Sequence, residues 1–319
     1  MKKAAFAVIA VLIVFALAET VARLAGSGGE QATFMRFTNP HREQSGFVPD
    51  DHLFWRLREN NPSWEVNASG FRGPDAPREK PAGQFRIVTL GDSCTFGLGT
   101  PGLRYDETYS ARLEQLLREA KPGRDIRVLN FGCPGYSSFQ GLRLLESKAA
   151  AYRPDLVIAY FGINDGFDAV GFADKDQRPV DAPALGPMRG ALAKSRLYAW
   201  LRGGLVRARR TTAPGEPLER VAIDDHHANL DAMAALTTRI GAKIHFIAPP
   251  YLEESDGSLR IETHRRHDPA IDVFPEMSAA AARGETVIFA SPDNVHPTPA
   301  GHAAIARAIA DVVVPEISD

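Results

Sequence analysis

From residue 85 to the C-terminus, short apolar runs alternate with longer stretches of helical periodicity, and this alternation limits the folds open to the chain. Strand-like runs occur at Phe85–Leu90, Ile126–Asn130, Leu156–Phe161, Lys243–Ala248 and Thr286–Ala290. Helical patterns occupy Thr108–Ala120, Ser138–Tyr152, Arg189–Arg210, Leu218–Ile240 and Pro299–Val313. Strands that alternate with helices form right-handed βαβ units. We therefore expect a five-stranded parallel sheet that helices cover on both faces.

Composition excludes several other classes of protein. Of the 319 residues, 44% are hydrophobic and 24% charged, a balance typical of a globular domain. The formal net charge of −2 gives no reason to expect nucleic acid as a partner. The two cysteines, Cys94 and Cys133, are too few for a disulfide-dense scaffold or a cysteine-rich metal site.

The N-terminal segment has the pattern of an export signal. Two lysines precede an uninterrupted apolar run from Ala4 to Ala18, and Ala16-Leu17-Ala18 matches a small-x-small cleavage site. The alternative is an uncleaved membrane anchor that extends past Glu19 to Arg23. In both cases we expect export to the periplasm or the cell exterior. Only an uncleaved form would contact the membrane, through residues 4–22.

Composition also divides the chain into three parts. We expect residues 1–25 to be the signal peptide or anchor, residues 26–84 an N-terminal extension, and residues 85–319 the main domain. The extension is rich in Gly, Pro, Asn and charge, yet it carries four large aromatic residues, Phe54, Trp55, Trp64 and Phe71. Disordered linkers rarely carry so many, so docking on the main domain is favoured over a free linker.

A serine follows the first strand-like run at a sharp turn. The apolar residues stop at Gly91, and Asp92 and Ser93 come next. Open α/β sheets bind their ligands outside the carboxyl ends of the strands. We therefore interpret Ser93 as a nucleophile at this edge of the sheet.

Three further polar motifs follow other strand-like runs. A glycine turn ending at Gly135 offers backbone N–H groups, and Asn164 offers a side-chain amide, two kinds of donor that can stabilise an oxyanion. Asp293 and His296 are three residues apart, so the carboxylate can hold the imidazole while its other nitrogen faces Ser93. Each motif alone is commoner in ordinary turns and caps. Together, on one sheet edge, they supply a complete set for acyl transfer.

Four blocks resemble those of the SGNH, or GDSL-type, hydrolases. They are GDS (91–93), the glycine turn, GIND (162–165) and DNVH (293–296), and the resemblance covers about residues 85–315. It implies a flavodoxin-like three-layer α/β/α sandwich and ester or acyl-transfer chemistry with no cofactor and no metal. It also implies roles for five residues: Ser93 as nucleophile, His296 as base, Asp293 as its orienting partner, and Ser93 N–H, Gly135 N–H and the Asn164 amide as oxyanion donors. Asp92, in the middle of the first block, is expected to be structural.

The resemblance implies a serine esterase or acyl hydrolase that works through an acyl-enzyme on a small-molecule or glycan ester. The upstream stretch VNASGFRG (66–73) is similar to a segment that precedes the core in exported bacterial members. Some of those relatives act on polysaccharide acyl groups, so an acylated carbohydrate is the first expectation. The alternatives are an O-acyltransferase to a polysaccharide and a catalytically idle exported interaction module. We expect residues 166–188 and 251–280, which lack periodicity, to set the substrate.

Other chemistries fit the sequence less well. Gly97–Gly102 matches GxGxxG, but six residues separate it from the strand, whereas a dinucleotide site begins directly after one. The α/β-hydrolase elbow GxSxG needs a glycine where this chain has Thr95. His226 and His227 are adjacent and cannot share a helix face, and no HExxH motif occurs, which disfavours a zinc hydrolase.

The two cysteines leave two alternatives open. Each lies beside one of the blocks, at the ends of expected neighbouring strands and in an oxidising compartment, which suggests a disulfide that braces the nucleophile turn. The alternative is a pair of small buried thiols.

Overall fold

The computed structural model describes residues 2–24, 46–99, 103–169, 173–176, 195–198, 218–289 and 293–317. The chain forms two compact units. One comprises Met1–Ser45 and Arg178–Pro217, and the other comprises Gly46–Gln177 and Leu218–Asp319. Most of the helix expected at Arg189–Arg210 lies outside the described residues.

The first unit contains helix α1 (Lys2–Leu24) and a helical turn at residues 196–198. Glu19 of α1 accepts hydrogen bonds from the backbone N–H groups of Leu197 and Arg196 and from the hydroxyl of Ser195. These hydrogen bonds lower the pKa of Glu19 to about 2, and the two backbone N–H donors have the largest effect. No helix within the described part of the chain is long and apolar enough to cross a membrane. The expected signal peptide or anchor stays a prediction.

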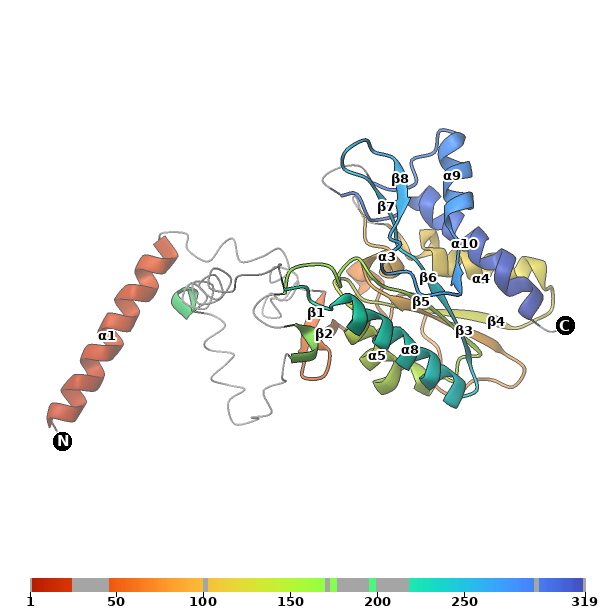
Figure 1. Cartoon of the computed structure of the whole chain (residues 1–319). Helices are drawn as coiled ribbons and strands as arrows, with labels where there is room; N and C mark the ends of the chain where they lie inside the picture. The colour runs from red at the N-terminus through yellow and green to blue at the C-terminus, as the bar shows by residue number, and fades with distance from the viewer. Residues whose placement is uncertain are drawn as a thin grey trace. The chain divides into compact units, whose positions relative to one another are not determined.

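The second unit is built around a five-stranded parallel sheet (Figure 1). Across the sheet the strands are β4 (Ile126–Gly132), β3 (Phe85–Gly91), β5 (Leu156–Tyr160), β6 (Lys243–Ile247) and β9 (Ala270–Ile271). In chain order this is 2-1-3-4-5, the flavodoxin-like arrangement, which puts the topological switch point between β3 and β5. The expected α/β sandwich is confirmed.

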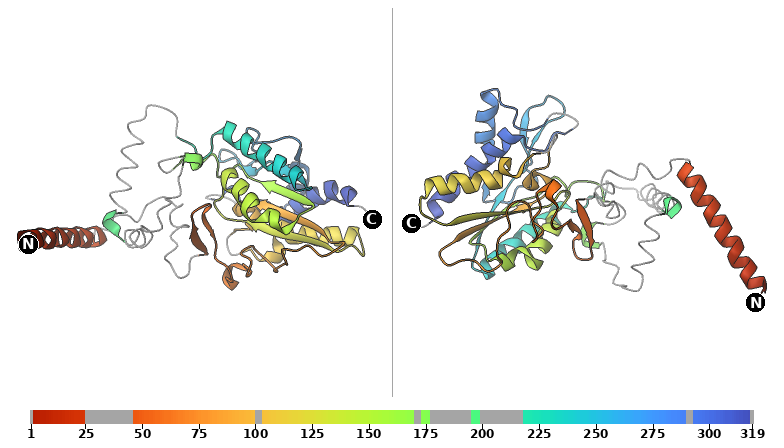
Figure 2. Two further views of the ribbon diagram at one scale, coloured as in Figure 1. Left: turned by 90° about the horizontal axis from the view of Figure 1, so that it is seen from below. Right: turned by 180° about the vertical axis from the view of Figure 1, so that it is seen from behind.

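Helices cover both faces of this sheet (Figure 2). Helix α4 (Tyr109–Ala120) packs against α10 (Pro299–Val313) on one face, and α5 (Ser138–Ser147) packs against α8 (Ile223–Arg239) on the other. Apolar residues four positions apart line the inner sides of α4 and α10, where Leu113, Leu117, Ile305 and Ile309 are all fully buried. Thr108 and Thr298 cap these two helices through their side chains, which explains why the predicted starts are close to the observed ones.

The fifth strand of the sheet differs from the sequence prediction. It is Ala270–Ile271, whereas Ile288 in the predicted strand makes only an isolated antiparallel bridge to Pro297. The backbone of residues 287–289 bonds instead to residues 296–298, through Phe289 N to His296 O and Thr298 N to Val287 O, both at 3.0 Å. The predicted strand therefore pairs with the loop that carries the imidazole.

Residues 251–280, expected to be irregular, contain regular structure. Strands β7 (Pro250–Leu252) and β8 (Leu259–Ile261) form an antiparallel hairpin, and α9 (Phe274–Ala282) follows. Three-residue strands and an alanine-rich helix have little periodicity of their own, which is why their pattern was missed.

Several short elements and element ends complete the unit. The 3₁₀ turns are η1 (Pro62–Trp64), η2 (Tyr105–Glu107), η3 (Ala149–Tyr152), η4 (Asp174–Asp176) and η6 (Val314–Glu316). Helix α8 begins at Ile223, five residues after its predicted start at Leu218. The backbone of residues 218–221 forms hydrogen bonds with that of residues 165–169 instead of continuing the helix.

Residues 46–84 lie in the same compact unit as the sheet. Their strands β1 (Phe47–Asp50) and β2 (Phe54–Leu57) form a hairpin, and Trp55 Nε1 donates to the carbonyl of Pro134 at 3.2 Å. Phe71 stacks on Phe131 of β4 with ring centroids 4.9 Å apart. These contacts join the segment to the end of β4 and the turn after it. The expected three-part division of the chain stays a prediction.

Candidate active site

Ser93 is the first residue of the one-turn helix α3 (Ser93–Phe96), which begins almost directly after β3. Asp92 caps this helix, since its Oδ1 accepts from the N–H of Cys94 at 2.8 Å. Gly91 has no room for a side chain, because a Cβ there would lie 2.0 Å from Thr95 Oγ1 and 2.8 Å from a strand carbonyl. The tight turn holds Ser93, 9% exposed, at the carboxyl edge of the sheet.

His296 lies between Ser93 and Asp293. Its Nε2 is 2.8 Å from Ser93 Oγ, and its Nδ1 is 2.8 and 2.9 Å from the two carboxylate oxygens of Asp293. Burial by itself raises the pKa of Asp293, but the hydrogen bonds and charge of His296 outweigh it and keep that pKa below its usual value. Because Nδ1 faces a carboxylate, it carries the ring proton and leaves the Nε2 lone pair facing the Ser93 hydroxyl.

The loop that carries Asp293 and His296 is held from two sides. Asp293 Oδ1 accepts from the backbone N–H of His296 at 3.1 Å, so the loop folds around its own carboxylate. Leu252 of β7 donates its N–H to the carbonyl of Asn294 at 2.8 Å and accepts from the Asn294 amide at 3.2 Å. The hairpin β7–β8 is thus a support for this loop that sequence patterns did not indicate.

Asn164 follows β5, beside the turn that carries Ser93. Its side chain is buried, and its Nδ2 donates to Asp92 Oδ2 at 3.0 Å. An amide nitrogen carries two hydrogens, so this bond fixes the amide and leaves one hydrogen for a ligand. Asp92 therefore orients Asn164 through one carboxylate oxygen and caps α3 through the other. Burial raises the pKa of this carboxyl group to about 6.

Gly135 lies in the turn after β4 with a left-handed φ of +82°, a conformation that favours glycine. Its carbonyl accepts from Nη1 of Arg220 at 2.8 Å. Arg220 and Asp174 form a buried ion pair, 2.8 Å between Nη2 and Oδ2, and Ser137 also donates to Asp174 at 2.6 Å. Sequence analysis missed Arg220 and Asp174, which no local motif marks. Arg220 fixes the turn by its hydrogen bond to the Gly135 carbonyl, and Asp174 by its hydrogen bond with Ser137.

Asp165 joins the two segments that carry the expected oxyanion donors. Its Oδ1 accepts from the N–H of Ser138, just after the Gly135 turn, at 2.8 Å, and its Oδ2 lies 2.5 Å from Nδ1 of His226. The other His226 nitrogen is 3.0 Å from the carbonyl of Arg265. Both ring nitrogens of this buried histidine are engaged in hydrogen bonds, so its contacts are those of a structural residue.

Cys94 and Cys133 are both buried free thiols, so the hypothesis of a disulfide between them is wrong. Cys94 Sγ donates to the carbonyl of Val295 at 3.5 Å and so contacts the loop of His296. Burial raises the pKa of both thiols well above the usual value, which keeps them protonated and unreactive.

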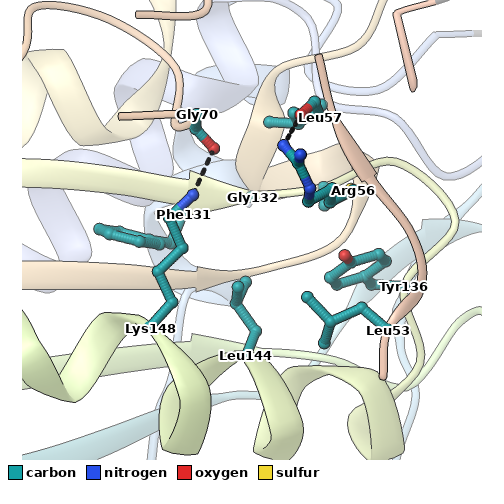
Figure 3. A pocket seen from close by; sticks show the side chains of 10 residues that line it. Leu53, Arg56, Leu57, Gly70, Phe131, Gly132, Tyr136, Leu144 and Lys148 are labelled. Carbon is teal, nitrogen blue, oxygen red and sulfur yellow. Dashed lines mark hydrogen bonds between the residues drawn. The ribbon is translucent and has the colours of Figure 1, made fainter. Parts of the chain in front are cut away.

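A small cavity lies between the β1–β2 hairpin, β4 and α5 (Figure 3). Its volume is about 30 Å³, room for one or two water molecules. Leu53, Tyr136, Leu144 and Lys148 are among its lining residues, and the Lys148 amine donates to the carbonyl of Gly70 at 3.4 Å. None of Ser93, Asp293 and His296 lines it, so it is separate from the candidate site.

A family model for the GDSL-like lipase/acylhydrolase family matches residues 89–304, a span that includes the serine, both oxyanion segments and the His296 loop. No curated protein matches the chain. Among solved structures, LAE5, an α/β hydrolase enzyme from the metagenome of Lake Arreo, is 18% identical over 73% of this chain and 97% of its own, with a TM-score of 0.46. A lipase/acylhydrolase from Enterococcus faecalis is 18% identical over 73% of this chain and 97% of its own, with a TM-score of 0.45. Axe2, an acetylxylan esterase from Geobacillus stearothermophilus, is 21% identical over 70% of this chain and 92% of its own, with a TM-score of 0.43.

Proposed function

Since the chain belongs to the GDSL-like lipase/acylhydrolase family and is a serine ester hydrolase, we propose that it cleaves its ester through an acyl-enzyme on Ser93. The observation that carries this proposal is the continuous set of contacts from Ser93 Oγ through the His296 imidazole to the Asp293 carboxylate. A nucleophile, a base in contact with it and a group that orients the base are the minimum set for acyl transfer through serine.

The proposed reaction has two half-reactions. His296 Nε2 takes the hydroxyl proton while Ser93 Oγ attacks the ester carbonyl, and Asp293 stabilises the imidazolium that forms. The oxyanion accepts hydrogen bonds from the N–H groups of Ser93 and Gly135 and from the remaining amide hydrogen of Asn164. His296 then protonates the leaving alcohol. Water, deprotonated by the same imidazole, releases the acid and restores Ser93.

For the substrate we propose an acylated carbohydrate. The support is the similarity of residues 66–73 to the segment that precedes the core in exported bacterial members. An O-acyltransferase would differ only in its second half-reaction, where a sugar hydroxyl would replace water as the acceptor. Hydrolysis and transfer therefore share the first half-reaction and are distinguished by the product.

Labelling and turnover together test this proposal. A fluorophosphonate should label wild-type protein on Ser93, and acetylated oligosaccharides and p-nitrophenyl acetate should both release acetate. Ser93→Ala should neither be labelled nor turn over, whereas Ser147→Ala, at an exposed serine of α5, should match the wild type. Acetyl transfer to added oligosaccharide in place of free acetate would identify a transferase. Turnover by Ser93→Ala at the wild-type rate would refute the proposal.

A further inference from the structure

Arg72 is a buried arginine that the proposed chemistry does not use. It belongs to the stretch VNASGFRG (66–73) and lies before residue 89, where the family match begins. Its side chain is only 4% exposed. Burying a guanidinium is costly unless its N–H groups find acceptors, so its partners indicate what it holds in place.

The guanidinium of Arg72 is directed at the nucleophile helix and the loop that follows it. Its acceptors are the carbonyls of Phe96 at 2.7 Å, Gly97 at 2.8 Å and Leu103, together with the carboxylate of Glu65 at 2.9 Å. It also lies over the ring of Phe96, 4.5 Å from the ring centroid. Three of the four acceptors are thus main-chain oxygens between residues 96 and 103.

Phe96 and Gly97 form the C-terminal end of the helix that begins at Ser93. Carbonyls at a helix C-terminus have no donor within the helix and carry partial negative charge, so a cation stabilises them. The N–H of Gly97 in turn donates to the carbonyl of Ser93 at 2.9 Å. One peptide unit therefore separates the guanidinium from the backbone of the nucleophile.

The backbone of Arg72 is fixed to the sheet. Its N–H donates to the carbonyl of Asn130, near the end of β4, at 3.1 Å. The Asn130 side chain donates to the carbonyl of Thr95 at 2.7 Å and accepts from the N–H of Gly132 at 2.9 Å. Arg72 thus connects a rigid strand to the helix of Ser93.

The loop that Arg72 holds also contacts the segment of His296. A Cβ on Gly99 would lie 2.7 Å from Phe289 Cε2, so the loop backbone is in close contact with that ring. The N–H of Phe289 donates to the carbonyl of His296 at 3.0 Å. Ser93 and His296 are therefore both connected to Arg72 through short series of contacts.

We propose that Arg72 is a positioning residue for the esterase reaction, and that it sets the distance between Ser93 Oγ and His296 Nε2. It acts through the helix end at Phe96 and Gly97 and through the loop contact with Phe289. The proposal rests on the proposed function of Ser93. Its consequence is that the segment upstream of the family match contributes to catalysis and does more than cover the core.

Arg72→Lys is the main test, because lysine keeps the charge but cannot form the planar fork that bonds several carbonyls at once. The rate of fluorophosphonate labelling of Ser93 and kcat for p-nitrophenyl acetate, each per titrated active site, should fall together by about 10- to 100-fold, with little change in KM. Arg56→Lys, at a more exposed arginine of the same segment, should retain wild-type values. A merely structural role for Arg72 would reduce the number of titratable sites and leave kcat per site unchanged, and that result would overturn the proposal.

Gly99→Ala keeps the test independent of the stability of the Arg72 variant. The added methyl group would lie 2.7 Å from Phe289 Cε2, so the loop or that ring must shift, and residue 99 itself provides no acceptor to Arg72. The labelling rate of Ser93 should therefore fall by about tenfold. An unchanged labelling rate in Gly99→Ala would refute the connection to His296. Turnover by Ser93→Ala would instead refute the proposed function itself, so the two failures are distinguishable.

Discussion

The side-chain amide of Asn164 donates to the carboxylate of Asp92 across 3.0 Å, and this bond connects the segment after β5 to the turn that presents Ser93. Asp92 uses its other oxygen to cap the helix of Ser93. One buried carboxyl group therefore orients the expected oxyanion donor and the nucleophile helix together. Asp92, the middle residue of the GDS block, therefore positions two other groups of this site.

Asp92→Asn should lower kcat by about 10²–10³, as much as Asn164→Ala. An amide at position 92 either places its NH₂ group against that of Asn164 or makes Asn164 turn its oxygen toward the oxyanion. In both cases the donor is lost. The kcat values of both single variants and of the double variant with p-nitrophenyl acetate measure this. Fully additive losses in the double variant would show that the two residues act separately.

The same carboxyl group should make stability depend on pH. Burial raises its pKa to about 6 in the folded protein from the ordinary value of 3.8, so the native state binds the proton more tightly. The resulting stabilisation is full below the unfolded pKa and is lost as pH rises through the folded pKa. As the pH rises from 3.8 to about 6, the free energy of unfolding of the wild type should fall, relative to Asp92→Asn, by about 1.4 kcal/mol per pH unit. Urea denaturation of both proteins at several pH values measures the difference, and parallel curves would contradict it.

Asp293→Asn should reduce kcat by about 10⁴ while the fold is retained. The carboxamide can turn its NH₂ group toward Nδ1 of His296, which moves the ring proton to Nε2 and removes the base from Ser93. Single-turnover acetylation of Ser93 isolates this step. Equal acetylation rates in the variant and the wild type would show that Asp293 does not orient the imidazole.

Arg220→Met should lower both stability and activity. It leaves the buried Asp174 carboxylate without its guanidinium, a loss of about 3–5 kcal/mol in the free energy of unfolding, and it frees the carbonyl of Gly135. Adding Asp174→Leu should restore part of the stability but little of kcat, since the Gly135 carbonyl still lacks its donor. Recovery of wild-type kcat in the double variant would rule out a role for Arg220 in positioning the turn.

Cys94 and Cys133 should react with a thiol reagent only after unfolding, and two thiols per chain should then be detected. Burial keeps both protonated in the native state. Reductant should accordingly leave the melting temperature unchanged. A chain that shows no thiols after unfolding without reductant would contradict the free state of these residues.

Much of the architecture followed from local patterns. The strand β3 and the helix α10 are marked by a continuous apolar run and by capped helical spacing, which act within a few residues of each other. The proximity of Ser93, Asp293 and His296 was also predicted, from the expectation that each follows a strand of one parallel sheet. That expectation holds for Ser93 after β3, whereas the segment before Asp293 is not a strand of the sheet. Their catalytic roles remain to be tested by the variants above.

What the sequence determined by itself was therefore the first four strands of the sheet, the helices with clear periodicity and the reactive groups that follow them, since periodicity and caps act over a few residues. Only the tertiary structure decided that β9 takes the place of Thr286–Ala290 in the sheet, and that Asp92 holds Asn164. It also decided that Arg72 and Arg220 reach carbonyls at least 24 residues away along the chain. Such contacts depend on which backbone oxygens folding leaves without a donor, and no local spacing encodes that.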